Sequence, residues 1–216
     1  KRLGGGVQGV AYGLHTVPLA IKEAPLKYHH KRIKPNDIKT IKKALGPGNE
    51  STIEVKVNIL ASMLFTESVS PHFLRYTSAF VCPKTASMYN VMETAHGEFS
   101  ELQKAIPPNT QSHMKLLDHS SIVFQLLHAS YVMQQVFKIK HHDMHSGNIM
   151  YVKCGPNDPP YVYNGELLND KNAFVYNVGR QKYYFPNRGY LLKIMDFGFS
   201  GFQVPTSKVR EVRTDF

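Results

Sequence analysis

The sequence predicts an α+β fold in which short antiparallel strands accompany one helix in the first half and the longest helix lies in the second. Two observations support this prediction. Short aliphatic and β-branched runs bounded by turn residues recur along the chain, and apolar residues recur at helical spacing in two longer segments. No repeat with a period of roughly 20 to 50 residues is present, which argues against a solenoid or a propeller.

The first half opens with a glycine-rich hairpin. Residues 3–12 have the sequence LGGGVQGVAY, and the run VPLAIK at 17–22 follows as a strand. A helix is expected over 49–64, where apolar residues keep a period of 3.6, and the pair Ser-Pro at 70–71 ends it. Two apolar segments at 73–81 and 87–93 then predict two further strands.

A basic insertion, residues 27–48, separates the second strand from the helix. Across residues 22–43, eight Lys or Arg side chains face two acidic ones. We expect a solvated and partly mobile segment, and docking to an acidic partner is the alternative. Only Tyr28 interrupts the basic run with an aromatic ring, so base stacking, and with it nucleic-acid binding, is not favoured.

The second half begins with a short helix at 98–106 and continues with the strongest helical pattern of the chain, at 120–138. The apolar stripe of that pattern is wide, so we expect the helix to be mostly buried. A Tyr-rich insertion, 151–190, holds seven of the twelve tyrosines and predicts a hairpin that turns at Asn177–Gly179. One more strand and a glycine turn are expected over 191–202.

The composition limits the class of protein. The chain has 216 residues with 26 Lys and Arg against 16 Asp and Glu, a net charge of +10, which attracts anionic partners. Cys82 and Cys154 are the only cysteines, which excludes a disulfide framework and a CxxC zinc motif. No apolar run is long enough to span a membrane and no signal peptide is visible. We therefore expect an intracellular protein without membrane contact.

The glycine run fits the pattern GxGxxG, in which glycines let backbone N–H groups approach phosphate oxygens. The glycines concerned are Gly4, Gly6 and Gly9. A strand follows where a dinucleotide fold would need a helix, so a flap over phosphates is favoured. A lysine at the end of such a strand is most often an edge residue whose charge reaches water. The functional alternative is that Lys22 contacts phosphates and pairs with Glu54, or with Glu50 if the helix register is shifted.

Two further motifs carry hard oxygen ligands. Asp143 and Asn148 form DxxxxN, and Asp196 opens a DFG triplet after an apolar strand. A carboxylate can orient an acceptor hydroxyl, while Asp and Asn oxygens suit Mg²⁺ ions that bridge phosphates. The histidines around Asp143 (His141, His142 and His145) leave a transition-metal site as an alternative. His141 is expected to be a packed residue that supports the loop.

Taken in this order, the four motifs resemble those of the eukaryotic-type protein kinase domain, from about residue 3 to 198. The resemblance implies two lobes: a sheet with one helix over 1–92, and a mainly helical lobe over 93–216. It implies that Lys22 and its partner Glu54 hold the ATP phosphates under the glycine flap, and that Asp143 is the catalytic carboxylate. It also implies that Asn148 and Asp196 bind Mg²⁺.

The segment VMETAHGEF at 91–99 resembles the hinge between kinase lobes. On this resemblance Met92 is the gatekeeper residue. The backbone groups of Glu93 and Ala95 contact adenine, and Glu98 reaches the ribose.

Three features depart from the family pattern. His142 replaces the arginine before the catalytic aspartate, which puts control by a phosphorylated activation loop in doubt. His145 replaces a lysine, as in haspin-like and aminoglycoside-phosphotransferase-like enzymes. In addition, 48 residues separate Asn148 from Asp196. The long gap, the HxDxHxGN loop and the strand before DFG are similar to those in kinases of large DNA viruses.

The expected activity is transfer of the ATP γ-phosphoryl group to a protein Ser or Thr hydroxyl, with Mg²⁺ as cofactor. A small-molecule kinase and a non-catalytic pseudokinase that acts as a binding module are the alternatives. The glycine motif begins near residue 1, and Phe216 lies only 20 residues after Asp196, with no APE-like motif between them. We therefore expect the chain to be a segment of a longer protein.

Overall fold

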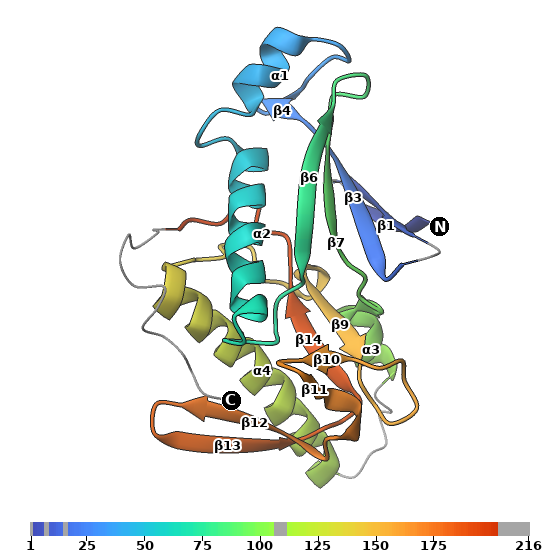
Figure 1. Cartoon of the computed structure of the whole chain (residues 1–216), viewed down its shortest axis with the longest axis vertical. Helices are drawn as coiled ribbons and strands as arrows, with labels where there is room; N and C mark the ends of the chain where they lie inside the picture. The colour runs from blue at the N-terminus through green and yellow to red at the C-terminus, as the bar shows by residue number, and fades with distance from the viewer. Residues whose placement is uncertain (1, 7–8, 15–16, 106–111, 203–216) are drawn as a thin grey trace.

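A computed structural model describes residues 2–6, 9–14, 17–105 and 112–202 of the chain. An antiparallel sheet and a long helix form the first part, and the second part gathers shorter strands along another long helix (Figure 1). This is a mixed α+β architecture, as predicted. Among the described residues, none of the helices combines the length and the hydrophobicity that crossing a bilayer requires.

The N-terminal sheet has five antiparallel strands in the order β1-β2-β3-β7-β6. Their bounds are Arg2–Gly6 for β1, Gly9–Gly13 for β2, Leu19–Pro25 for β3, Ser87–Glu93 for β7 and Tyr76–Cys82 for β6. In the register, Lys22 lies between Ala11 of β2 and Asn90 of β7. The predicted strands are confirmed, except that β6 begins three residues later than expected. Phe73 is instead fully buried and bridges to Ile194.

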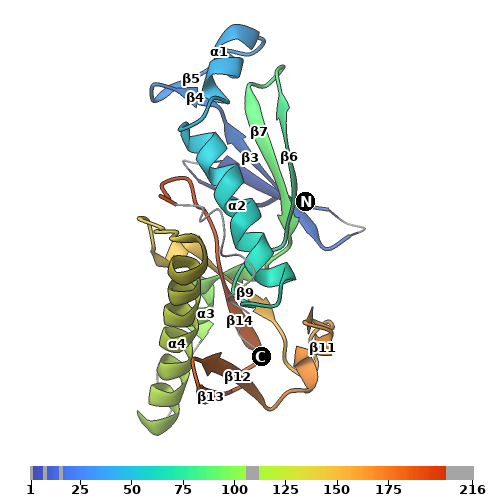
Figure 2. The ribbon, with the colours of Figure 1, turned by 60° about the vertical axis from the view of Figure 1, so that its left-hand side comes forward.

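Helix α2, Glu50–Thr66, packs along this sheet (Figure 2). It buries Val57, Ala61 and Leu64, which repeat at helical spacing, and with them the charged Glu54. The helix ends before the predicted Ser-Pro pair because the N–H groups of Val69 and Ser70 turn back to the carbonyl of Leu64.

The basic insertion folds as a small hairpin and a helix at the far end of the sheet (Figure 1). These are β4, Lys27–Tyr28, β5, Lys31–Arg32, and α1, Ile38–Ala44. The segment has a hydrophobic cluster with the adjoining turn of the sheet, made of Leu26, Ile33, Ile41, Ala44, Ala86 and Met88. Buried apolar side chains therefore anchor the insertion, while most of its lysines face solvent.

The second part begins with β8, Gly97–Glu98, and α3, Phe99–Ala105, and continues with α4, Ser112–Phe137. A short turn, η1, Ser146–Asn148, leads into β9, Ile149–Lys153, and β14 follows at Tyr190–Ile194. The sheet order is β14-β9-β8. Strand β14 is buried along its whole length. Asp196 lies two residues after its end, and the Asp196 side chain is 11% exposed.

The Tyr-rich insertion forms short strands, among them the two strands of the predicted hairpin. It contains β10, Val162–Tyr163, β11, Glu166–Leu167, η2, Leu168–Asp170, β12, Ala173–Val178, and β13, Gln181–Pro186. The described residues thus do not show the expected mainly helical second lobe, because this β-forming segment fills much of it. Its hairpin turns at Gly179-Arg180, slightly later than predicted, and Gly179 supplies the positive φ of 63° that the turn requires.

Over residues 119–137, helix α4 is buried on one side only. Val132, Met133, Val136 and Phe137 lie in the main core with α2 and β14. On the opposite face Val123 is 53% exposed, Leu127 64% and Tyr131 49%. The prediction of a mostly buried helix was therefore wrong. The apolar stripe is wider than the face of the helix that packs against the core, so part of the stripe faces solvent.

A buried cluster of aromatic rings and imidazoles connects the Tyr-rich insertion to the core. His72 donates from Nδ1 to the carbonyl of Leu192 at 2.9 Å, and its Nε2 accepts from the Tyr176 hydroxyl at 3.1 Å. His128 of α4 packs against both rings. Burial keeps the pKa of His72 well below its ordinary value and lowers the pKa of His128 to about 4. Both rings are therefore neutral near pH 7.

The low pKa values of these two imidazoles predict that the folded chain loses stability in acid. Their folded pKa values lie below the unfolded value of about 6.5, so the unfolded chain binds more protons. Their contribution is complete above about pH 6.5 and is lost as the pH falls toward about 4. In His128→Phe, the slope of the unfolding free energy against pH in this window should decrease by up to about 1.4 kcal/mol per pH unit. Urea unfolding at several pH values measures it, and an unchanged slope would contradict the assignment.

Candidate active site

Three charged side chains from three elements meet at one buried point. The Nζ atom of Lys22 on β3 lies 2.8 Å from Glu54 Oε1 on α2. The same Nζ lies 3.2 Å from Oδ2 of Asp196, which follows β14. The structure therefore pairs Lys22 with Glu54, not with the alternative Glu50, and adds Asp196 to the pair.

The cluster carries one positive and two negative charges. Burial acts to lower the pKa of Lys22, but the carboxylates of Glu54 and Asp196 outweigh burial and raise it. Burial raises the pKa of Glu54 as well, and the charge of Lys22 only partly offsets this effect. The ammonium is thus firmly charged at neutral pH, and the excess of negative charge favours a cation at this place.

The loop between α4 and β9 holds the two other predicted polar residues together. Asn148 Nδ2 donates to the backbone carbonyl of Asp143 at 2.9 Å and to its Oδ2 at 3.1 Å. His145 accepts from the N–H of Gly147 with Nδ1 at 3.1 Å, and its Nε2 lies 3.8 Å from Asp143 Oδ2. One oxygen of Asp143 is therefore fixed by neighbours, while the residue is only half-buried.

His141 is packed beside this loop and supports it through hydrogen bonds, as predicted. It is 5% exposed, and its Nε2 donates to the carbonyl of Met195 at 2.9 Å. Its Nδ1 accepts from the N–H of Asp143 at 3.3 Å. Across the part of the chain that the structure describes, no three His, Cys, Asp or Glu side chains gather as they would for a metal ion. The histidines of this loop thus give no support to a transition-metal centre.

A cavity of about 580 Å³ is lined by several of these groups, but Asp143 is not among the residues that line it. Lys22, Asn148 and Asp196 line it together with His145 and the hinge residues Glu93, Ala95 and Glu98. Its apolar wall consists of Leu3, Val10, Ala11, Ala20, Leu74, Met92, Met150 and Met195. A site with a mostly apolar wall and a few convergent polar groups is typical of small-molecule binding.

The predicted glycines lie in the hairpin that borders this cavity. Gly4 pairs with Ala11 and Gly6 with Gly9, and the neighbouring Leu3 and Ala11 face the cavity. The tip of the hairpin, residues 7–8, lies outside the described residues. The prediction of an antiparallel glycine hairpin is confirmed; its contact with phosphates stays a prediction.

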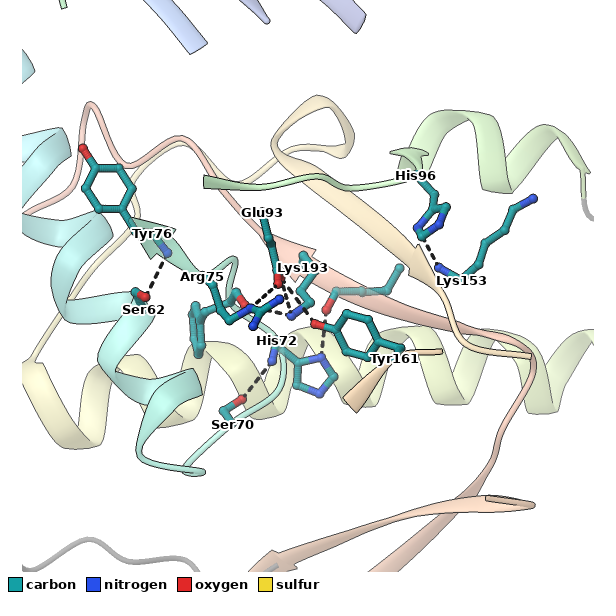
Figure 3. Close-up of polar contacts among 12 residues, drawn as sticks. Ser62, Ser70, His72, Arg75, Tyr76, Glu93, His96, Lys153, Tyr161 and Lys193 are labelled. Carbon is teal, nitrogen blue, oxygen red and sulfur yellow. Dashed lines mark hydrogen bonds and ion pairs between the residues drawn. The ribbon is translucent and has the colours of Figure 1, made fainter. Parts of the chain in front are cut away.

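The structure also shows a second buried polar cluster that the sequence reading missed (Figure 3). Glu93 Oε1 lies 3.0 Å from Lys193 Nζ, and Glu93 Oε2 lies 3.0 Å from Arg75 Nε. The hydroxyl of Tyr161, from the Tyr-rich insertion, donates to Glu93 Oε1 at 3.3 Å. Lys193 also donates to the carbonyl of Phe73 at 2.8 Å. The available signal was the lysine in the apolar strand LLKIM, which needed a buried partner.

This second cluster determines the charge of Glu93, the first residue of the predicted hinge that was expected to contact adenine. Burial lowers the pKa of Lys193 to about 8, although Glu93 acts in the opposite direction. Burial acts to raise the pKa of Glu93, but Lys193 and Arg75 outweigh it and lower that pKa. The carboxylate is thus ionised and fixes the end of β7, where the hinge begins, to β14 and the insertion.

Comparison with known proteins finds a distant similarity to a probable protein kinase. The chain is 23% identical over 133 residues to a protein of Dictyostelium discoideum described as a probable serine/threonine-protein kinase. The match covers 61% of this chain, and it spans about a tenth of the relative's length, 10%. No model of a protein family matches the chain. The chain is therefore distantly similar to a probable Ser/Thr protein kinase.

The second cluster predicts a large cost for removing its lysine. Lys193→Met leaves the buried Glu93 with fewer compensating charges, so we expect the unfolding free energy to fall by about 3 kcal/mol or more. Lys182→Met, on the exposed strand β13, makes the same chemical change at the surface and should have little effect. Chemical unfolding compares the two variants. A loss below about 1 kcal/mol in Lys193→Met would show that the cluster does not stabilise the fold.

Proposed function

We propose that the chain carries out ATP- and Mg²⁺-dependent transfer of the γ-phosphoryl group to Ser or Thr hydroxyls of proteins. The observation that carries this proposal is the meeting of Lys22, Glu54 and Asp196 at a cavity that Asn148 also lines. The distant similarity to a probable Ser/Thr protein kinase supports it. The two kinase lobes would then be residues 1–92 and 93–216.

Lys22 would contact the α- and β-phosphates. Glu54 holds the lysine in place at 2.8 Å, so its ammonium does not need to reorganise when the nucleotide binds. Asp196 and Asn148 offer the hard oxygen atoms that Mg²⁺ takes, and two protein ligands suffice because phosphates and water complete its shell. The excess negative charge around Lys22 fits such a cation. When bound, Mg²⁺ supplies neutralisation of the phosphate charge.

Asp143 would orient the acceptor hydroxyl and take its proton. Asn148 donates to Oδ2 of Asp143, which leaves Oδ1 as the oxygen that accepts from the hydroxyl. His141 and the loop around it hold the backbone of Asp143. Catalysis would therefore depend mainly on positioning and on preorganised charge.

The apolar part of the cavity would accept the adenine ring. Ala20, Met92 and Met150 supply flat apolar contacts around the hinge. The N–H of Ala95 has no hydrogen-bond partner among the described residues, so it can donate to the ring, and the Glu93 carbonyl can accept from the ring's amino group. Glu98, exposed at the edge of the cavity, would reach the ribose. The similarity to kinases of large DNA viruses stays a prediction from the sequence.

The role of Asp196 predicts a loss of turnover without a loss of fold. Asp196→Asn removes a carboxylate from the proposed Mg²⁺ site, so the rate of phosphoryl transfer should fall by about 100-fold or more. Asp170→Asn makes the same change at an exposed turn and should leave the rate unchanged. Transfer from radiolabelled ATP to a mixed protein substrate measures both, with chemical unfolding as the check on folding. Unchanged turnover in Asp196→Asn would rule out the assignment.

The class of acceptor needs a separate test, because His145 lines the cavity where protein kinases have a lysine. This observation favours the alternative of a small-molecule kinase. We expect label to appear on Ser and Thr of casein or histone and not on aminoglycosides or simple alcohols. Label on the small acceptors alone would support the alternative. Binding of ATP with Mg²⁺ but no transfer to either class would support a non-catalytic module.

A further inference from the structure

A second cavity, of about 640 Å³, borders the same hinge segment. It shares Leu3, Glu93 and His96 with the proposed nucleotide cavity. Its remaining lining comes from the end of β2 and the described residues between β2 and β3, from Arg75 and Thr94, and from the Tyr-rich insertion. These residues are Gly13, Leu14, Val17, Pro18, Arg75, Thr94, Val152, Lys153, Pro159, Pro160, Tyr161 and Val162. This volume lies in the usual range for small-molecule sites.

The walls of this cavity, the hinge-insertion cavity, are largely apolar and accessible. Pro18 lines it from the chain between β2 and β3, and Pro159 and Pro160 line it from the Tyr-rich insertion. Four large apolar side chains that line it are strongly exposed: Leu3 at 49%, Leu14 at 42%, Val17 at 43% and Val162 at 55%. Side chains of this kind gathered around one hollow favour an apolar ligand body over water.

At one end of the hinge-insertion cavity the charges do not balance. Arg75 and Lys193 bring two positive charges to the single carboxylate of Glu93, so the cluster keeps a net charge of +1 (Figure 3). Asp158, near the same wall, accepts from the N–H of Gly155 and makes no ion pair with either cation.

The surplus charge reaches the cavity through Arg75. Its Nε is engaged by Glu93, and its guanidinium lies 5.8 Å from the centre of the Phe65 ring. The two terminal nitrogens have no hydrogen-bond partner in the described part of the chain, and the side chain is 56% exposed. A guanidinium presents these nitrogens as a planar fork that matches a carboxylate.

We propose that the hinge-insertion cavity binds an organic monocarboxylate, with its carboxylate on the terminal nitrogens of Arg75 and its apolar body against the proline and valine walls. One negative charge completes the balance of the Arg75–Glu93–Lys193 cluster. The apolar walls select for a hydrocarbon body over a free inorganic anion. This site shares Leu3, Glu93 and His96 with the proposed nucleotide cavity, but its ligand takes no part in phosphoryl transfer, and its test uses no nucleotide.

Octanoate is a suitable probe because it has one carboxylate and an aliphatic body, and 1-octanol is its neutral counterpart. Octanoate should raise the midpoint of thermal unfolding in a saturable manner, by about 3–6 °C at ten times its dissociation constant. 1-Octanol at equal concentration should give less than half of this shift. In Arg75→Gln the octanoate shift should disappear.

A pair of surface variants keeps the test decisive if Arg75→Gln does not fold. Val162→Asp places a negative charge at the mouth of the hinge-insertion cavity and should weaken octanoate binding at least tenfold. Val123→Asp makes the same substitution on α4, where the exposure is nearly equal, 53% against 55%, and should leave binding unchanged. A non-saturable shift, equal shifts from octanoate and 1-octanol, or equal effects of the two aspartate variants would each overturn the proposal.

Discussion

The ion pair between Lys22 and Glu54 joins strand β3 to helix α2, and Asp196 brings the chain after β14 to the same ammonium. A buried charge of this kind is stable only while its partners are present, so it fixes three elements relative to one another. The sheet, the helix and the second part of the molecule must therefore meet where the proposed nucleotide cavity lies. The extra negative charge that results is unfavourable for folding alone and favourable for binding a cation.

The Glu93 cluster performs a similar task at the other end of the cavity. It fixes the end of β7 to β14 through Lys193, and to the Tyr-rich insertion through Tyr161. The insertion thus supports the hinge instead of extending away from the domain. Residues of both clusters line the cavity: Lys22 and Asp196 from the first, and Glu93 from the second.

The sequence identified Lys22, Asp143, Asn148 and Asp196 as candidates because they lie in short motifs with defined spacing, and their roles stay predictions. It also predicted the glycine hairpin and the strands of the first half, where turn residues mark the boundaries. The sequence did not predict the features that depend on which side chains become buried in the folded chain. The exposed face of α4 has the same apolar periodicity as the buried one, and the partners of Lys193 come from segments distant in sequence. In the Tyr-rich insertion the hairpin was predicted, but the short pair β10–β11 was not, because strands of two residues leave no clear pattern in the sequence.

The central claim is that the cavity beside Lys22 binds ATP with Mg²⁺. A crystal structure with a non-hydrolysable ATP analogue and Mg²⁺ tests it most directly. The account predicts adenine between Ala20 and Met150, phosphates on Lys22 with the Lys22–Glu54 pair intact, and metal on Asn148 and Asp196. A nucleotide bound elsewhere, or phosphates that leave Lys22 and Asp196 without contact, would contradict it.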